Sequence, residues 1–212
     1  MHEPEWAKSS RTDVRVPRRL VIGISGASGI IYGIRALEFL RHLDIETHLV
    51  MSKSAEMTLA YETDLKPSDV CDMASTHHPA SDIGASISSG SFSTMGMLIV
   101  PCSIRTMSEI ATGVTGSLLS RAADVALKER RRLVLAVRET PLHAGHLRTM
   151  TCLAEMGAIV APIVPAFYNR PQSIDDIINH TVGRLLDLFG VESGAVKRWH
   201  GRPAKSYPAK KA

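Results

Sequence analysis

The sequence predicts a three-layer α/β/α protein, in which helices cover both faces of a mainly parallel β-sheet. Two patterns carry this prediction. Short apolar runs rich in β-branched residues recur along the chain, and such runs are typical of strands buried on both faces. Most of them are followed by a segment whose apolar residues repeat about every 3.6 positions, which indicates an amphipathic helix. Strands that alternate with helices build parallel βαβ units, so we expect one continuous sheet.

The first unit combines a strand, a glycine-rich turn and a helix. Residues 20–24 (LVIGI) form the apolar strand, residues 23–29 (GISGASG) form the turn, and the helix runs through about His42. Backbone N–H groups at the start of such a helix can bind an anion, and glycines let the backbone approach it closely. The turn is therefore either a phosphate-binding loop or a tight connection without a ligand, and the motif alone does not decide between them.

The same patterns place the remaining elements. We expect further strands at residues 45–51, 97–100, 133–137 and 158–164, with Pro101 ending the strand before it. We expect helices at residues 54–61, 68–73, 118–128, 145–156 and 173–189, and a further helix that starts after Thr106 and runs through about Ala111. Ser68 and Ser173 are the expected N-caps, and Gly157 is the expected glycine after a helix C-terminus. Residues 77–91 are predicted to be irregular.

The composition indicates one globular domain in a reducing, cytoplasmic compartment. The chain has 212 residues, of which 44% are hydrophobic, enough for a full core. We expect the α/β domain at residues 19–191, with loosely packed tails at 1–18 and 192–212 that carry much of the +4 net charge. Cys71, Cys102 and Cys152 lack CxxC spacing, and no apolar run suits a signal peptide or a membrane span. Aromatic residues make up only 5% of the chain, which argues against a stacking platform for nucleic acid.

Polar and charged residues collect where the predicted strands end. The carboxyl ends of the strands are followed by Ser25–Gly29, Ser52, Ser103–Thr106 and Arg138–Glu139. Ligands of open parallel sheets bind at this edge, and hydroxyls, backbone donors and cations suit a phosphorylated ligand. Dinucleotide-binding folds place an acidic residue at the end of the second strand, where this chain has Ser52. The sequence therefore favours a mononucleotide over NAD.

Other polar motifs point to less specific roles. His143 and His146 have HxxH spacing, but no carboxylate stands at ligand spacing, so a metal site is not favoured. Ser28 lacks the G-x-S-x-G context of a nucleophilic hydrolase. The basic run 128–132 (KERRR) is typical of a solvated helix end. If it faced inward or a subunit interface, the same run could bind a second phosphate.

Several motifs together resemble one family of flavoproteins. They are GISGASG (23–29), SISSGS (86–91), PCSIRT (101–106), RAADV (121–125), KERR (128–131), RETP (138–141) and PAFYNRP (165–171). With this set, the chain resembles the flavin prenyltransferases, the UbiX family, which also contains proteins formerly called the small subunit of phenolic acid decarboxylases. The resemblance runs from about Arg19 to Val191.

The resemblance implies a flavodoxin/Rossmann-like fold, a homo-oligomer that is typically a dodecamer, and reduced FMN as co-substrate. The implied reaction transfers a dimethylallyl group from dimethylallyl phosphate to flavin N5 and closes a ring onto C6, without a metal. The implied recipient of the prenylated FMN is a UbiD-type decarboxylase. Neither nucleic acid nor a membrane is an implied partner.

The resemblance also implies roles for individual residues. Ser28 would orient flavin N5, Glu139 would relay a proton, and Glu62 would act near the flavin as a third catalytic residue. The implied FMN contacts are Gly26, Ala27, Ser28, Ser52, Ser103, Ile104, Arg105, Thr106 and Arg138. The implied contacts of the prenyl phosphate are Arg121, Lys128, Arg138, Glu139, Tyr168 and Arg184. Trp199 resembles a C-terminal tryptophan that covers the pocket.

One departure and three alternatives remain. Some relatives carry an aromatic residue just before the Ser-Gly-Ser loop, where this chain has Ala85 to Ile87. An FMN-dependent cysteine decarboxylase would share the fold, but its catalytic histidine and asparagine motif is not found. A non-catalytic flavin carrier or decarboxylase subunit, and a nucleotide-binding domain of other chemistry, are the remaining alternatives. The sequence does not indicate which decarboxylase and pathway are served, or whether the pyrophosphate donor is also used.

Overall fold

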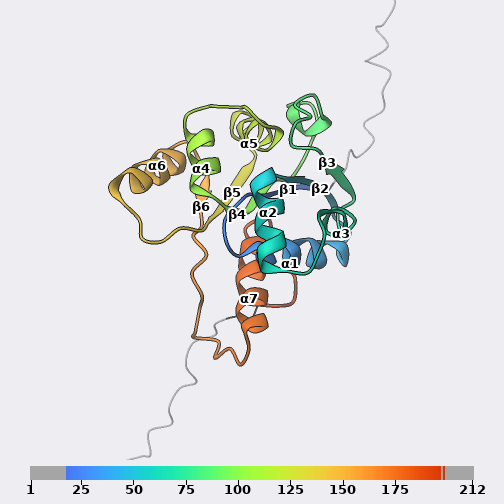
Figure 1. Ribbon diagram of the computed structural model, residues 1–212, viewed down its shortest axis with the longest axis vertical. Coiled ribbons are helices and arrows are strands. Elements are labelled where there is room, and N and C mark those ends of the chain that lie inside the picture. The colour runs from blue at the N-terminus through green and yellow to red at the C-terminus, as the bar shows by residue number, and fades with distance from the viewer. Residues whose placement is uncertain (1–17, 197, 199–212) are drawn as a thin grey trace, which may run out of the picture.

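The computed structural model describes residues 18–196 and 198, and it confirms the predicted fold class. One parallel sheet has the strand order β3-β2-β1-β4-β5-β6 (Figure 1). The strands are β1 (Arg19–Ile24), β2 (Glu46–Met51), β3 (Thr76–His78), β4 (Gly96–Cys102), β5 (Arg132–Val137) and β6 (Ile159–Val160). The predicted tails fall largely on residues 1–17, 197 and 199–212, which lie outside the described residues, as does Trp199.

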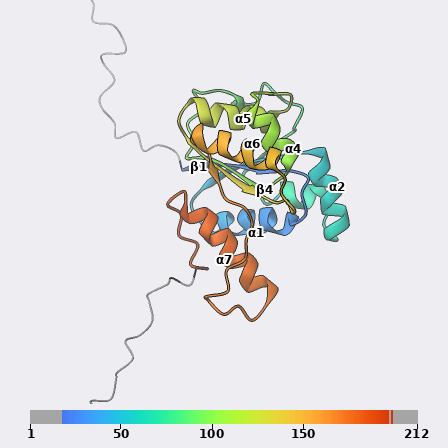
Figure 2. The ribbon, with the colours of Figure 1, turned by 90° about the vertical axis from the view of Figure 1, so that its left-hand side faces the viewer.

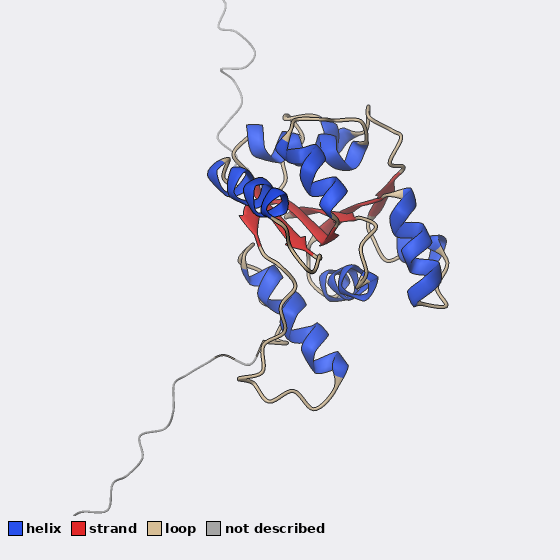
Figure 3. Cartoon of the chain, turned by 60° about the vertical axis from the view of Figure 1, so that its left-hand side comes forward, coloured by secondary structure: helices blue, strands red, loops and turns tan. Residues whose placement is uncertain are grey.

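Helices cover both faces of this sheet, as Figures 2 and 3 show. The helices are α1 (Ile30–Arg41), α2 (Lys53–Glu62), α3 (Pro67–Cys71), α4 (Ile104–Ala111), α5 (Leu118–Lys128), α6 (Ala144–Glu155) and α7 (Ile174–Asp187), with a 3₁₀ turn at Ser86–Ser88. Because side chains alternate along a strand, Ile22 packs toward α1 and α7 while Val21 belongs to the core under α4 and α5. None of the helices in the described part of the chain is long and apolar enough to cross a membrane.

Most predicted helices agree with the structure, and two of their ends are confirmed by capping contacts. Ser173 begins α7, where its hydroxyl accepts the Asp176 N–H at 3.1 Å and the Asp176 carboxylate accepts the Ser173 N–H at 3.2 Å. Gly157 follows α6 with a φ of 99°, the left-handed conformation that glycine adopts easily. The prediction of Ser68 as an N-cap is wrong. Helix α3 begins one residue earlier, at Pro67, because proline is preformed for the first helical position.

The predicted strands differ from the observed ones in three places. Strand β3 lies within residues 76–78, where the sequence suggested an irregular region starting at 77. Strand β4 does not stop before Pro101 but continues through it to Cys102, and the register against β5 shifts in this stretch, so the missing proline N–H is tolerated. Strand β6 is shorter than predicted, since Pro162 lacks an N–H. Ala161 and Ile163 on either side of it still donate to β5 at 2.9 and 3.0 Å.

Candidate functional site

A cavity lies at the carboxyl ends of the central strands. The chain leaves β1 toward β2 on one side and β4 toward β5 on the other, so the turns after these neighbouring strands diverge. The cavity has a volume of about 740 Å³. Its lining residues are Gly26, Ser52, Lys53, Ser54, Ala80, Ser81, Ser103, Ile104, Arg105, Thr106, Glu109, Val114, Gly116, Ser117, Leu119 and Glu139.

Ser25 joins the two turns that border this cavity. Its hydroxyl is completely buried, donates to the Pro101 carbonyl at 3.0 Å and accepts the Ser103 N–H at 2.7 Å. A buried hydroxyl with both a donor and an acceptor partner fixes the backbone around it. The end of β1 and the start of α4 are therefore held in one relative position. The sequence placed Ser25 among the polar residues at the strand ends, because it directly follows the first strand, but it did not predict a contact for this residue.

The N-terminus of α4 faces the cavity and is rich in hydroxyls. Ser103 is its N-cap and accepts the Thr106 N–H at 3.3 Å, while its own hydroxyl donates to Thr106 Oγ1 at 3.2 Å. All four residues from Ser103 to Thr106 line the cavity, as the sequence predicted for FMN contacts. Unpaired N–H groups, hydroxyls and the positive end of the helix dipole suit a phosphate here.

The second strand end closes another side of the cavity. Ser52 caps α2 by accepting the Ala55 N–H at 3.1 Å, and it lines the cavity as predicted. Gly26 packs directly on this helix, since a Cβ added to it would lie 2.2 Å from Ser54 Cβ. Only glycine allows the turn after β1 to approach α2 so closely. The polar wall between Gly26 and Ser52 depends on that approach.

Glu62 does not line the cavity but caps helix α1. Its carboxylate accepts the N–H groups of Gly29 and Ile30, both at 2.9 Å to Oε2. A carboxylate thus already occupies the anion position at the end of the glycine-rich turn. The phosphate-binding interpretation of this turn is therefore not supported at Gly29 and Ile30. Of the two helices that start beside the cavity after β1 and β4, α4 has the N-terminus open to it.

The end of β5 contributes two predicted residues, but only one lines the cavity. Glu139 faces it and accepts the Thr140 N–H at 2.9 Å. The Arg138 backbone N–H donates to the Cys102 carbonyl at 3.0 Å, and its side chain is exposed. In the turn after β1, Ser28 is exposed and Ala27 is half-buried, and neither is among the residues that line the cavity. Burial raises the pKa of the nearby Cys102 thiol to about 12, so this thiol is no nucleophile at neutral pH.

The residues predicted to bind the prenyl phosphate are mostly outside this cavity. Arg184 lies in α7, and Tyr168 lies in the loop before it, which projects from the body of the molecule (Figure 1). Arg184 lines a separate cavity of about 220 Å³ and pairs with Asp187 at 2.7 Å. The Tyr168 hydroxyl lies 3.0 Å from His180 Nε2. A single chain therefore does not bring these groups to Glu139.

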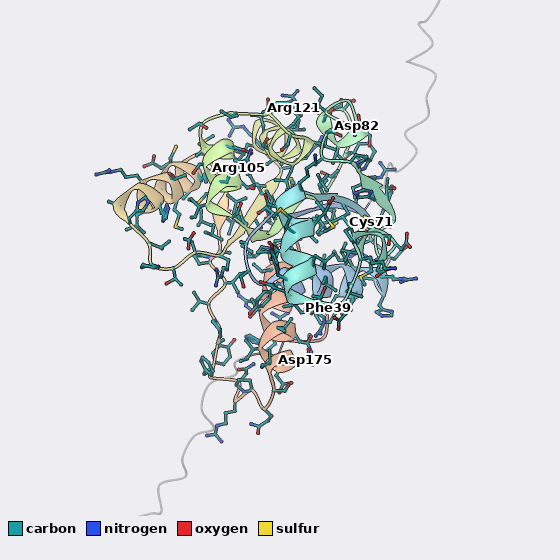
Figure 4. All side chains as sticks on the ribbon, viewed as in Figure 1. Phe39, Cys71, Asp82, Arg105, Arg121 and Asp175 are labelled. Atoms are coloured by element: carbon teal, nitrogen blue, oxygen red, sulfur yellow. The ribbon has the colours of Figure 1, made fainter. Side chains whose placement is uncertain are left out.

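The cations of α5 lie apart as well. Arg121 pairs with Asp124 at 3.2 Å, and Figure 4 shows it on α5 while Arg105 stands on α4. Lys128 ends α5 and pairs with Glu129 at 2.5 Å, with 46% of its side chain exposed. Helix α5 runs antiparallel to the strands. Lys128, at its C-terminus, therefore lies near the amino ends of the strands, whereas the cavity lies at their carboxyl ends.

The Ser-Gly-Ser loop is held by a residue that the sequence did not single out. Arg131 donates to the carbonyl oxygens of Phe92, at 2.6 Å, and Gly90. Ala85 and Ile87, at the position of the missing aromatic residue, are buried in the core beneath this loop. The cavity wall on that side comes from Ala80 and Ser81 instead.

The histidine pair at the start of α6 has a capping role. His143 is the N-cap, and its Nδ1 accepts the N–H groups of Gly145 and His146 at 3.0 and 3.4 Å. The two imidazole rings stack with centroids 3.6 Å apart. No group of three or more potential metal ligands occurs in the described part of the chain.

Comparison with known proteins identifies the family. The Flavoprotein family model matches residues 8–186. The flavin prenyltransferase UbiX of Escherichia coli K12 is 60% identical over 187 residues, which cover 87% of this chain and 99% of that protein. The chain belongs to the UbiX flavin prenyltransferase family. UbiX proteins are also its structural relatives: AnUbiX in complex with FMN and dimethylallyl pyrophosphate has a TM-score of 0.87 at 51% identity, covering 88% of this chain and all of that one.

A second solved UbiX structure shows how much of the chain shares the similarity. The dodecameric FMN-dependent UbiX-like decarboxylase of Escherichia coli O157:H7 has a TM-score of 0.84 at 47% identity and covers 86% of this chain and 100% of its own. Similarity of this extent spans the whole sheet and the cavity at its edge. The UbiX family membership therefore applies to the complete α/β domain rather than to one motif.

Proposed function

We propose that this protein transfers a dimethylallyl group from dimethylallyl phosphate to N5 of reduced FMN and then closes a ring onto C6. In the first step a bond forms at flavin N5 as the carbon–oxygen bond to the phosphate breaks, and N5 loses its proton. In the second step the alkene of the prenyl group takes up a proton, its tertiary carbon bonds to C6, and the C6 proton is lost. The hydroxyl-rich cavity carries the proposal, since it lies in a fold that superposes closely on a relative solved with FMN and a dimethylallyl donor.

The flavin phosphate is proposed to bind at the N-terminus of α4. Ser103, Arg105 and Thr106 line the cavity there, and the alternative N-terminus of α1 already holds the Glu62 carboxylate. A second negative charge beside Glu62 would be repelled, whereas the α4 dipole attracts it. Gly26, Ala27, Ser28 and Ser52 then contact the rest of the flavin, with Ser28 oriented toward N5.

The departing phosphate needs positive charge, and we assign this role to Lys128, Arg138 and Arg184. Fixed cations stabilise charge that develops on a leaving group. Since Lys128 and Arg184 lie away from the cavity of their own chain, we propose that neighbouring copies supply them in a homododecamer, with Arg121 and Tyr168. Glu139, on the cavity wall, relays the proton between phosphate and flavin.

The product is proposed to serve a UbiD-type decarboxylase in the cytoplasm. All three cysteines, Cys71, Cys102 and Cys152, are free thiols in the described structure, which supports a reducing compartment.

The test combines purified protein, reduced FMN and dimethylallyl phosphate in the presence of a chelator. Mass spectrometry should detect a flavin heavier by one C5 hydrocarbon unit. Recovery of unmodified FMN alone, under conditions where FMN binds, would refute the proposal.

Substitution of Glu139 separates an enzyme from a flavin carrier. We expect Glu139→Gln to reduce the rate of prenylation by at least about a hundredfold, because the proton relay is lost. FMN affinity should stay within about threefold, since the α4 contacts are retained and a surface change of this kind has small effects. Equal activity of Glu139→Gln and the wild type would contradict the assigned role.

A further inference from the structure

His180 lies beneath Tyr168 in the projecting part of the molecule. It is on the inner side of α7, only 4% exposed, whereas Tyr168 is 50% exposed. His180 Nε2 and the Tyr168 hydroxyl are 3.0 Å apart, and the rings meet edge to face with centroids 5.4 Å apart. Arg184 follows His180 by one helical turn and therefore lies on the same side of α7.

The second ring nitrogen of His180 decides the direction of this hydrogen bond. His180 Nδ1 is buried and has no hydrogen-bond partner among the described residues. If Nδ1 carried the proton, a buried N–H would be left unpaired, and unpaired N–H groups are rarer in proteins than unpaired acceptors. The proton is then on Nε2, and His180 donates to the Tyr168 oxygen.

We propose that His180 is a positioning residue that makes the Tyr168 hydroxyl a donor to the phosphate of the prenyl substrate. By donating to the Tyr168 oxygen, His180 directs the hydroxyl proton away from itself. A hydroxyl that accepts a hydrogen bond also becomes a stronger donor. The opposite arrangement would point the hydroxyl proton at His180 and its lone pairs at the negative phosphate. This inference rests on the proposed function, in which Tyr168 contacts that phosphate.

The surroundings keep the imidazole neutral, as this role requires. Burial lowers the pKa of His180, and the positive charge of Arg184 lowers it further, while Asp187 acts in the opposite direction. A neutral imidazole carries a proton on only one of its two nitrogens. Because Nδ1 is unprotonated, the proton is on Nε2, which is therefore the donor. In this arrangement Arg184, on the same helix, supplies positive charge to the phosphate, and the Tyr168 hydroxyl donates an oriented hydrogen bond to it.

The experiment compares His180→Leu, which removes the donor, with His180→Gln, whose amide N–H can occupy the position of Nε2. Steady-state prenylation is measured with dimethylallyl phosphate as the varied substrate and saturating reduced FMN. We expect His180→Leu to raise KM about tenfold with little change in kcat. The reason is that one well-oriented hydrogen bond to a charged group, from the Tyr168 hydroxyl to the phosphate, is lost. His180→Gln should keep KM within about twofold of the wild type.

Tyr168→Phe completes the test. It should raise KM as His180→Leu does, and the double variant should be no worse than Tyr168→Phe alone, because His180 acts only through the hydroxyl. The inference would be overturned if the KM of the double variant rose by the product of the two single increases, or if His180→Leu left KM unchanged. If His180→Leu does not fold, His180→Met replaces it in the same comparison. A wild-type protein without prenylation activity would refute the proposed function instead, whereas a uniform loss of FMN binding in both His180 variants would mark a merely structural residue.

Discussion

At the scale of single residues, the site is defined by where charge is already compensated. Glu62 supplies its own carboxylate to the N–H groups that open α1, whereas the start of α4 is capped by the neutral hydroxyl of Ser103, which donates to Thr106. The two helices begin at adjacent strands, yet they offer a phosphate opposite environments. The position of the flavin phosphate follows from this difference rather than from the glycine motif alone.

A close backbone contact makes Gly26 a sensitive position. In Gly26→Ala the new methyl group would lie 2.2 Å from Ser54 Cβ, so the turn or α2 has to move. We expect FMN affinity to fall at least about tenfold, as shifts of this kind cost about 1–3 kcal/mol. Fluorescence titration with FMN measures the change.

Gly84→Ala is the matched control for this substitution. Its nearest neighbour would be Asp82 Oδ1 at 3.6 Å, an ordinary contact, so FMN affinity should not change. Equal affinities of Gly26→Ala and Gly84→Ala would show that the approach to α2 is not needed.

Some site residues were predictable from the sequence because they stand within two positions of a strand end. Ser52 and Ser103 directly follow their strands, Glu139 is the second residue after β5, and all three line the cavity. The capping contact of Glu62 was not predictable, since it joins positions more than thirty residues apart, at separations of 32 and 33. The packing of Arg131 on the Ser-Gly-Ser loop was missed for another reason, because a basic run normally indicates a solvated helix end.

At the scale of elements, the edge strand β3 is attached through a contact between a buried and a half-buried histidine. His48 on β2 is 4% exposed, and its Nδ1 lies 2.9 Å from His78 Nε2 on β3. Glu46, in turn paired with Arg19, contacts the other nitrogen of His48 at 3.0 Å. A strand of three residues gives little periodic signal, which explains why the sequence did not predict it.

These histidines predict a loss of stability in mild acid. Burial lowers the pKa of both His48 and His78, although Glu46 and Asp82 oppose the shift and Arg19 and His77 support it. The folded state thus favours neutral rings, and the unfolded chain binds more protons below the ordinary histidine pKa of about 6.5. The free energy of unfolding should be constant above about pH 7 and decrease as the pH falls toward about 5.

Urea unfolding at several pH values measures this dependence. His78→Gln should flatten the slope below about pH 6.5, whereas the exposed His42→Gln should leave it as in the wild type. The explanation fails if His42→Gln and His78→Gln have the same slope.

The loop before β4 depends on one arginine. Arg131→Met removes the hydrogen bonds to the carbonyl oxygens of Gly90 and Phe92. We expect the free energy of unfolding to fall by about 2 kcal/mol, as for other hydrogen bonds to charged groups. Chemical denaturation measures the loss, and Arg130→Met at the exposed neighbouring position should have little effect. Similar stabilities of the two variants would contradict this anchoring role.

At the scale of the whole molecule, the segment 164–174 carries several exposed apolar side chains. Val164, Phe167 and Ile174 are 73, 67 and 77% exposed, and they lie on the loop before α7 and on the first residue of that helix. Figure 3 shows helices, strands and loops in separate colours, with one helix and its loop extending below the sheet. Exposed apolar groups gathered in one region mark an interaction surface. This agrees with the proposed assembly, in which the same segment carries Tyr168, and α7 carries Arg184, to another copy.

A substitution on this surface is therefore expected to weaken assembly without abolishing FMN binding. Phe167→Asp should shift the protein to smaller species in size-exclusion chromatography with light scattering, because it places a charge in the proposed interface. Prenylation should fall with assembly, while FMN still binds, since the cavity is formed within one chain. Asp44→Lys, at an exposed turn, serves as the control. An unchanged oligomer in Phe167→Asp would exclude this surface from the interface.

The buried Ser25 hydroxyl has a consequence for how the site comes into existence. Its two partners, Pro101 and Ser103, are 76 and 78 positions further along the chain. Contacts of such long sequence separation form late and only when the strands between them have paired. A partly folded chain thus lacks the flavin site altogether, and a ligand that binds only the native state stabilises that state. Flavin content is therefore a direct measure of how many molecules in a preparation have completed folding.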